Sequence, residues 1–340
     1  MFRRRCSLTG APAPKSLRDV FAQMLLIDGG ATFGNREGAF LRCYFKPCGF
    51  KNKSWRIIEG AEPKIYERLA PYIMRLSAVD HLDMPPILFN RIEVELPPKA
   101  RLQYEEFEKE LLIEITLRTG QVEEVSASTA SVLYGKCQQF ANGAVYKDQD
   151  PLAKKQTGRQ RGFNEFHSQK IEALIDLVNE LNGKPLLIAY NFSHDYDRIE
   201  AALKKAKVKF EHIGSGVSPA KSEKVRRDFI DGKIDYIVGH PASMGHGVDG
   251  LQQRCNDVVF FSLTDNYENY EQFYKRIWRQ GIDAQVRVHL ICCKETVDDL
   301  IYHRLQDKEN AQTTLLDALQ HYRQMKLDKV RDYGGSVRSN

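Results

Sequence analysis

The sequence predicts an α/β fold, in which residues 166–320 form a mostly parallel β-sheet covered by helices on both faces. Short apolar runs rich in Val, Ile and Phe alternate regularly with amphipathic stretches from about residue 167 onward. Continuous apolar runs are typical of buried strands, and strands that alternate with helices favour a parallel sheet. A composition of 42% hydrophobic and 28% charged residues is ordinary for a globular protein.

The elements of this half follow one another in a regular order. Residues 166–183 have apolar side chains at helical spacing and close on Gly183, which predicts a helix that ends there. Ser218 and Pro219 form an N-cap and first-turn pair, which predicts a helix that runs through Phe229. Further helices are expected at 194–206 and 267–278, and strands at 185–192, 208–213, 234–240, 257–263 and 286–293.

The first 165 residues do not alternate so cleanly, and they are predicted to be mainly helical. A boundary between the two halves is expected near residue 165. Helices are expected at 16–28, 63–79, 99–115 and 129–143, one strand at 87–97, and loops or linkers at 29–40 and 146–163.

The formal net charge is +5, which indicates a mild preference for polyanionic partners. Basic residues gather at 147–162, at 204–209 and in the tail 321–340. A solvated charged face is the default interpretation of such runs, and nucleic acid is the alternative if other motifs require it. The N-terminus is basic but has no apolar stretch behind its arginines, and no run is long enough to cross a bilayer. We therefore expect a cytoplasmic protein with no membrane partner.

Seven cysteines are scattered along the chain, and none forms a CxxC pair. Cys43 and Cys48 could be half of a zinc site, but no second half with matching His or Cys spacing follows. Reduced thiols are the favoured interpretation, and no metal site is expected.

The segment 267–281 places Gln272, Arg276 and Arg279 at i, i+4 and i+7. On a helix these offsets bring the three side chains to one face. Two guanidinium groups on one face suit a developing negative charge, as an arginine finger does in a nucleotide hydrolase. A solvent-exposed basic helix is the alternative, and spacing alone favours it.

Glycines follow the strand expected at 234–240. Gly245, Gly247 and Gly250 would let the backbone approach a ligand, and Asp249 could accept a hydrogen bond from a ribose hydroxyl. A plain turn explains such glycines equally well, and His246 is as readily structural as functional.

Taken in order along the chain, several segments resemble the motifs of Swi/Snf-like superfamily-two helicases and translocases, with phage members the most similar. Residues 8–12 (LTGAP) are similar to motif III, 189–192 (AYNF) to motif IV, 243–252 (SMGHGVDGLQ) to motif V, 272–281 (QFYKRIWRQG) to motif VI, and 75–86 (RLSAVDHLDMPP) to the segment after motif III.

The resemblance implies a RecA-like second lobe, the helicase C-terminal domain, preceded by a mainly helical insertion and a remnant of the first lobe. The corresponding ranges are 166–320, 36–165 and 1–35, followed by a basic tail at 321–340. It implies the following roles: catalytic for Gln272, Arg276 and Arg279; cofactor-binding for Gly245, Gly247 and Asp249; coupling or nucleic-acid contact for Thr9, Gly10, Asn191 and Ser243.

Two positions depart from the family pattern: Ile282 stands where Gln is usual, and Asp249 stands where Asn is common. The sequence also contains no GxxxxGK[ST] segment, which would cradle the phosphates of a nucleotide. We therefore expect ATP and Mg²⁺ to bind only if a missing first lobe is supplied, and the chain alone to be inactive.

The expected partners are DNA, bound without sequence preference, and a chain that carries the missing lobe. An apolar surface at residues 1–25 would seek such a partner. If the protein is phage-encoded, its location would be the host cytoplasm. A non-catalytic DNA-binding remnant of such a motor is the alternative function, and an unrelated nucleotide-binding α/β enzyme is a third.

Overall fold

The structure of this protein is a computed structural model, which describes residues 5–7, 17–48, 54–73, 85–118, 125–147, 161–214, 216–244, 249–282 and 284–306. The chain divides into two compact units. The first consists of residues 1–81 with 122–124, and the second of residues 82–121 with 125–340. Each unit is described by itself.

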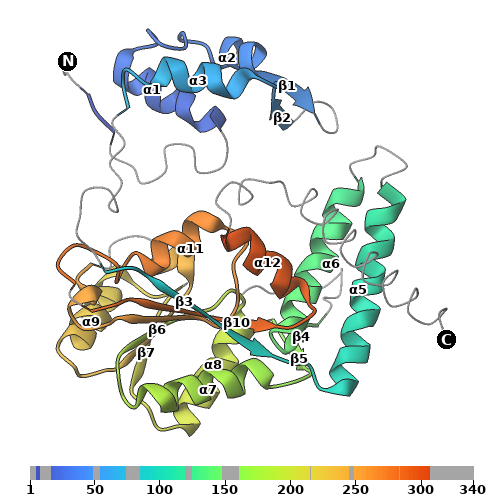
Figure 1. Cartoon of the computed structure of the whole chain (residues 1–340), viewed down its shortest axis with the longest axis vertical. Helices are drawn as coiled ribbons and strands as arrows, with labels where there is room; N and C mark the ends of the chain where they lie inside the picture. The colour runs from blue at the N-terminus through green and yellow to red at the C-terminus, as the bar shows by residue number, and fades with distance from the viewer. Residues whose placement is uncertain are drawn as a thin grey trace, which may run out of the picture. The chain divides into compact units, whose positions relative to one another are not determined.

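The second unit is built on a parallel β-sheet (Figure 1). Within the described residues its strand order is β3-β10-β9-β6-β8-β7, and every neighbouring pair is parallel. The strands are β3 (Leu88–Val94), β6 (Leu186–Ala189), β7 (Phe210–Ile213), β8 (Tyr236–Gly239), β9 (Asp257–Phe260) and β10 (Arg287–Cys293). The predicted α/β fold is confirmed.

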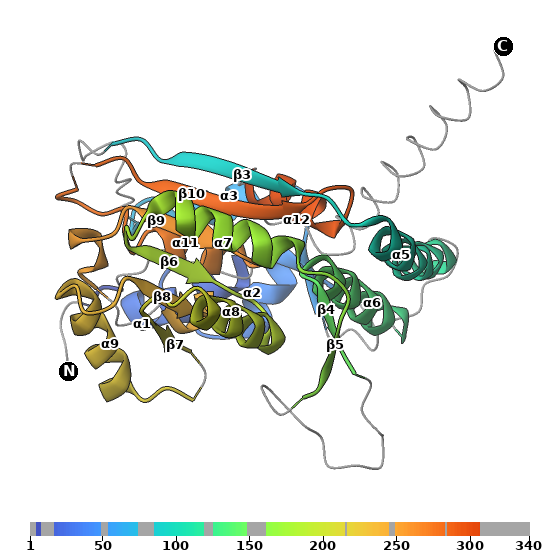
Figure 2. The same ribbon diagram turned by 90° about the horizontal axis from the view of Figure 1, so that it is seen from below.

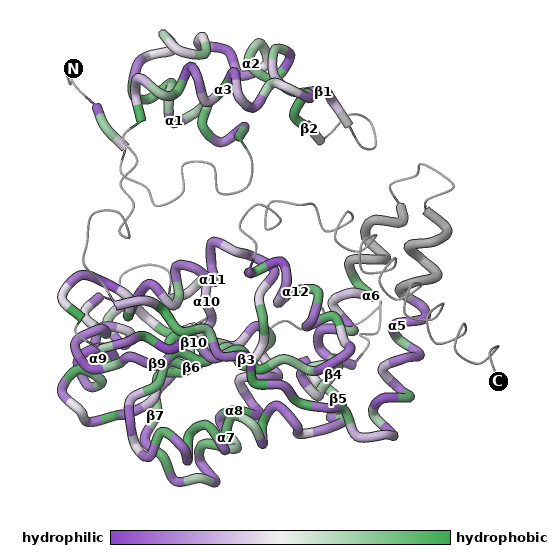
Figure 3. Tube along the Cα trace, viewed as in Figure 1, coloured by the Kyte–Doolittle hydropathy of each residue, from purple (hydrophilic) through white to green (hydrophobic). Residues whose placement is uncertain are grey.

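Helices cover both faces of this sheet, because successive side chains of each buried strand point to opposite sides. On β6, Leu186 and Ile188 pack with α7 (Gln169–Leu181) and α8 (Ser193–Lys205), whereas Leu187 and Ala189 belong to the core on the other face. That second core includes α9 (Pro219–Ile230), α11 (Tyr267–Tyr274) and α12 (Val297–Gln306). Figure 3 shows the largely hydrophobic strands between the two helical layers, and Figure 2 looks onto the sheet from the side of α7 and α8.

Two predicted helix boundaries in this unit agree closely with the structure. Ser218 caps α9 by accepting a hydrogen bond from the backbone N–H of Lys221 at 3.2 Å. At the end of α7, Asn182 adopts a left-handed conformation with φ 46°, one residue before the predicted Gly183.

A helical pair and a small hairpin belong to the same unit as the sheet. Helices α5 (Pro98–Arg118) and α6 (Val125–Ala141) pack side by side, and β4 (Ala144–Tyr146) pairs antiparallel with β5 (Phe163–Glu165). The hydroxyl of Tyr104 on α5 accepts a hydrogen bond from the backbone N–H of Val297 at 2.8 Å, which ties α5 to the start of α12.

The first unit has a separate small core. Its elements are a 3₁₀ turn (Leu17–Asp19), α1 (Val20–Asp28), α2 (Glu37–Tyr44), β1 (Phe45–Cys48), β2 (Ser54–Ile57) and α3 (Ala61–Leu69). Val20, Phe21 and Met24 are buried in this core together with residues of α2 and α3. The prediction of an apolar surface was therefore wrong for residues 17–25, because most of their large apolar side chains are buried by other residues of the same unit.

Several boundaries differ from the predicted ones. The expected divisions at residues 35 and 165 each fall inside a compact unit, because β3 pairs with β10 and α2 packs with α1. Helix α2 begins inside the stretch predicted as a loop at 29–40, and the β4 and β5 strands lie at the two edges of the loop predicted at 146–163. The helix expected at 63–79 is observed over Ala61–Leu69, and residues 74–79 lie outside the described residues. No helix of the described residues is both long enough and apolar enough to span a membrane.

Candidate functional site

The described parts of the predicted motifs in the second unit lie at one edge of the sheet. Because the strands are parallel, the loops that follow β6, β8 and β9 all leave from their carboxyl ends, where α/β proteins usually bind ligands. Asn191, after β6, donates a hydrogen bond from its amide nitrogen to the carbonyl oxygen of Leu263, after β9, at 3.2 Å. Ser243 lies exposed on α10 (Pro241–Met244), which follows β8.

Two arginines converge on one carboxylate oxygen at this edge. Nη1 of Arg276 lies 3.1 Å and Nη1 of Arg279 lies 2.9 Å from Oδ1 of Asp249. The exposed fractions of the side chains are 12% for Arg276, 37% for Arg279 and 67% for Asp249. The arginines are therefore held against the protein, while the carboxylate faces solvent.

The local geometry of these arginines differs from the predicted helix face. Helix α11 ends at Tyr274, and the chain continues in tight turns in which the N–H groups of Arg276 and Ile277 bond to the carbonyl oxygens three residues earlier. Ile277 is fully buried, and Nε1 of the Trp278 indole donates to the carbonyl oxygen of Pro85 at 3.0 Å. These two anchors fix the turn that presents both arginines.

Gln272 does not join the arginines. It lies on α11, and its amide nitrogen donates to Oε1 of Glu268 at 2.8 Å. The prediction that all three side chains share one helical face is therefore wrong, because the helix ends before Arg276.

A third arginine, Arg226 of α9, binds the backbone of the segment that contains Asp249. Its Nη1 donates to the backbone carbonyl oxygen of Asp249 at 3.0 Å, and its Nε and Nη2 bind the carboxylate of Glu223 at 2.8 and 2.7 Å. Hydrogen bonds from Arg226 and Arg227 lower the pKa of Glu223 to about 2. We call Arg226, Arg276 and Arg279 the arginine cluster. Arg226 had no recognisable signal in the sequence.

Electrostatics at the cluster favour an anion. Burial lowers the pKa of Arg276, and the neighbouring charge of Arg279 adds to this, whereas Asp249 opposes both. A guanidinium stays protonated in proteins despite such a shift. The two adjacent positive charges therefore need a negative partner, which in this structure is Asp249.

Gly250 has to be glycine for geometric reasons. Its φ is +91°, in the region that side chains rarely adopt, and an added Cβ would approach Nη1 of Arg226 and Cδ1 of Ile230 to 3.3 Å. It thereby lets the chain turn directly after Asp249.

The remaining predicted residues are placed only in part. Thr9, Gly10, Gly245 and Gly247 lie outside the described residues. The proposed contact between Asp249 and a ribose stays a prediction. Across the described ranges, no group of three or more His, Cys, Asp and Glu side chains could hold a metal ion.

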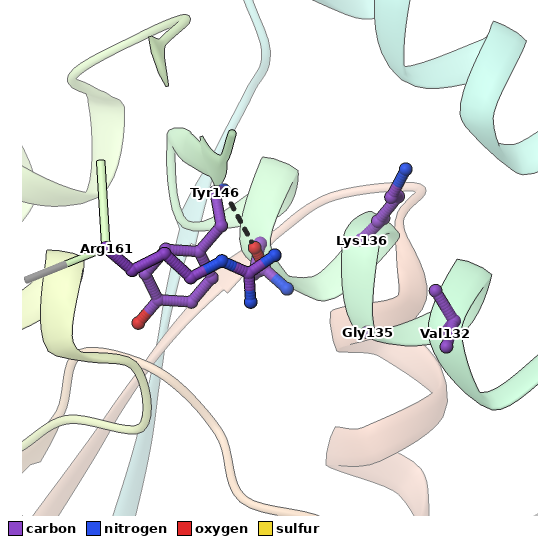
Figure 4. Close-up of a pocket in the computed structure, with 6 residues that line it drawn as sticks. Val132, Gly135, Lys136, Tyr146 and Arg161 are labelled. Carbon is purple, nitrogen blue, oxygen red and sulfur yellow. Dashed lines mark hydrogen bonds between the residues drawn. The ribbon is translucent and has the colours of Figure 1, made fainter. Parts of the chain in front are cut away.

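A second basic feature lies between α6 and the loop end of the β4–β5 hairpin. A groove of about 340 Å³ is lined by Val132, Gly135, Lys136, Gln139, Tyr146 and Arg161. The guanidinium of Arg161 lies across the ring of Tyr146, 4.5 Å from its centroid (Figure 4). Oε1 of Gln139 accepts a hydrogen bond from the backbone N–H of Tyr146 at 3.0 Å. We call this feature the hairpin groove. Among the described residues, its lining includes two cationic side chains and no carboxylate.

Comparison with known proteins identifies the domain that carries the arginine cluster. Residues 169–281 match the helicase conserved C-terminal domain family. Over 324 residues the chain is 33% identical to protein p41 of Acyrthosiphon pisum secondary endosymbiont phage 1, covering 93% of this chain and 65% of that protein. It is also 29% identical over 106 residues to the ATP-dependent helicase wrn-1 of Caenorhabditis elegans, covering 31% of this chain and 10% of wrn-1.

Solved structures share the fold. The C-terminal part of the Fun30 ATPase domain is similar with a TM-score of 0.54 and 15% identity, over 73% of this chain and 99% of that one. The Sulfolobus solfataricus SWI2/SNF2 ATPase core in complex with dsDNA gives a TM-score of 0.52 and 16% identity, over 95% of this chain and 65% of that one.

The chain thus spans less than two thirds of the length of the phage relative and of the Sulfolobus core. Residues 169–281 match the helicase conserved C-terminal domain family, and the chain shares its fold with Swi2/Snf2 ATPase cores.

Proposed function

We propose that this chain is the second-lobe half of an ATP-dependent DNA helicase or translocase, in which Arg276 and Arg279 act as arginine fingers. The observation that supports this role is the convergence of both guanidinium groups on one oxygen of Asp249, at 3.1 and 2.9 Å. A phosphoryl group in transfer also carries its charge on oxygens, and guanidinium donors stabilise that charge. Asn191 and Ser243, at the same edge, are proposed to contact nucleic acid.

ATP and Mg²⁺ are proposed to bind only when a nucleotide-binding lobe is supplied by another chain. The sequence has no GxxxxGK[ST] segment to hold the phosphates and to bind magnesium through its Ser or Thr hydroxyl. Gly245, Gly247 and Asp249 would then contribute the second side of the cleft around the nucleotide.

The purified 340-residue chain is therefore expected to hydrolyse no ATP above background, with or without DNA. A phosphate-release assay at saturating ATP and Mg²⁺ measures this directly. Robust DNA-stimulated ATP hydrolysis by the chain alone would contradict the proposal that ATP binds only when another chain supplies a nucleotide-binding lobe.

The hairpin groove is proposed to be part of the DNA contact. Lys136 and Arg161 line it, and the connection 147–162 carries five basic and two acidic residues. Phosphates attract such clusters without regard to base sequence, and the binding weakens as salt rises because counterions are released. Arg161, stacked on Tyr146, is already oriented for such a contact.

Replacing Lys136 or Arg161 with Gln is expected to weaken binding to duplex DNA of any sequence. Each substitution should also reduce the slope of log K against log salt by about 0.9, the value for one lost phosphate contact. Fluorescence titration at several salt concentrations measures both quantities. Lys233→Gln is the matched control, since Lys233 is exposed and pairs with Asp228 and Asp231. Unchanged slopes for both groove variants would remove the groove from the DNA contact.

A non-catalytic DNA-binding remnant is the second candidate function, and the missing GxxxxGK[ST] segment favours it. In that case the arginine cluster would bind DNA phosphates. Replacing its arginines would then change the affinity for DNA and would not change ATPase turnover. The reconstitution experiment argued in the Discussion separates the two candidates.

A further inference from the structure

A side chain of the protein itself, Asp249, occupies the position at which Arg276 and Arg279 would together bind an anion. Asp249 Oδ1 lies within 3.1 Å of Nη1 of Arg276 and Nη1 of Arg279. A carboxylate oxygen has the charge and the acceptor geometry of a phosphate oxygen, and both bind guanidinium in the same way. Any phosphate that reaches these arginines therefore competes with Asp249.

The exposures indicate which group would move. Arg276 is 12% exposed and fixed by the buried turn around Ile277, whereas Asp249 is 67% exposed. An incoming anion can approach from the side on which Asp249 faces solvent. The arginines can keep their positions while the carboxylate leaves.

The backbone of Asp249 is held separately from its carboxylate. Its carbonyl oxygen accepts a hydrogen bond from Nη1 of Arg226, and Gly250 packs against Arg226 and Ile230. Release of the carboxylate therefore needs only a change of its side-chain rotamer. Substitution of this exposed side chain is expected to leave the fold intact.

We propose that Asp249 is an internal ligand of the oxyanion site formed by Arg276 and Arg279, which a terminal phosphate group must displace. This inference rests on the proposed arginine fingers and adds their regulation. Asp249 lowers the affinity of the arginines for free phosphates, so that they engage only a phosphate that is also held elsewhere. An Asn at this position would have no charge with which to compete.

The test measures binding of inorganic tripolyphosphate to the full chain by isothermal titration calorimetry at low salt. Asp249→Asn is expected to bind about 3- to 10-fold more tightly than the unchanged protein, because the two ion pairs of Asp249 no longer oppose binding. Asp249→Glu keeps the charge and should bind within about twofold of the unchanged protein. Asp231→Asn is the matched control, since Asp231 is 55% exposed and pairs with Lys233.

A second set of variants assigns the gain to the two arginines. Arg276→Ala and Arg279→Ala, each combined with Asp249→Asn, should abolish the gain in tripolyphosphate affinity. The proposal is overturned if Asp249→Asn gains no affinity or shows no binding at all. It is also overturned if Asp231→Asn or Asp249→Glu gains as much as Asp249→Asn.

This experiment is independent of the proposed function, since it uses neither DNA nor ATP hydrolysis nor a second lobe. Suppose that Asp249→Asn gains affinity for tripolyphosphate, while the arginine variants keep normal ATPase turnover in a reconstituted motor. The proposal that Asp249 is an internal ligand would then stand, and the proposal that the arginines are fingers would be refuted. The opposite pair of results would keep the fingers and remove the internal ligand.

Discussion

Replacing Arg276 or Arg279 with Ala is expected to lower the DNA-stimulated ATPase turnover of a reconstituted two-lobe motor by about 10³-fold or more. The reconstitution mixes this chain with a chain that carries a GxxxxGK[ST] lobe. Closure of the two lobes would transfer the guanidinium groups from Asp249 to the γ-phosphate. Replacement with Lys should also cut turnover by orders of magnitude, because Lys keeps the charge but loses the planar fork of donors.

Turnover has to be measured at saturating DNA, because the alternative role of the arginines is DNA binding. If they only bind DNA, the variants lose affinity for DNA but keep full turnover once DNA is saturating. Unchanged turnover would therefore refute the finger assignment. Arg279→Ala gives the cleaner comparison, since its side chain is 37% exposed and its loss should change stability by less than about 0.5 kcal/mol. Arg276 is more buried, so its variants also need a measurement of thermal stability.

The parallel sheet could be predicted from sequence because its strands are local, continuous apolar runs. Residues 185–192, for example, contain β6, whose side chains are all buried. The domain boundaries could not be predicted in this way. Strand β3 pairs with β10, about 200 residues later along the chain, and no local pattern records such a partner. The β4–β5 hairpin was missed because each strand has only three residues, too few for a period-two pattern to stand out.

The candidate site was predicted in part. The spacing of Arg276 and Arg279 indicated correctly that the two side chains lie together, but helical periodicity could not show that α11 ends at Tyr274. It also could not show that Asp249, 27 residues before Arg276, would be their shared partner. Arg226 was missed because it lies on a helix with many other charged residues, where spacing does not distinguish it.

Lys170 shows most clearly how sequence alone misjudges a charged residue. It stands in the polar start of α7, yet its side chain is fully buried. Its Nζ lies 2.5 Å from Oδ2 of Asp298 and 2.8 Å from Oδ1 of Asn142. Asn142 follows α6, and its amide nitrogen donates to Oδ2 of the buried Asp195 on α8 at 3.2 Å. This network joins α6, α7, α8 and α12, and so attaches the helical pair to the sheet.

Replacing Lys170 with Met is expected to lower the free energy of unfolding of the second unit by about 3–5 kcal/mol. Without Lys170 the carboxylate of Asp298 remains buried without its cation, although it still accepts a hydrogen bond from the backbone N–H of Cys293 at 2.9 Å. Urea denaturation measures the loss. A Trp55→Phe background leaves Trp278 as the fluorescent reporter of this unit, since the chain has two tryptophans.

Two further variants test whether the loss comes from the unpaired charge. Adding Asp298→Asn to Lys170→Met removes that charge, so the double variant should lose less than the sum of the two single losses, with a coupling of about 2 kcal/mol or more. Lys204→Met is the control, since Lys204 is 66% exposed on α8 and its loss should cost less than about 0.5 kcal/mol. A loss below about 1 kcal/mol for Lys170→Met, or full additivity with Asp298→Asn, would contradict the buried pair. In that case the attachment of the helical pair to the sheet would depend on apolar contacts such as those of Tyr104 and Phe140.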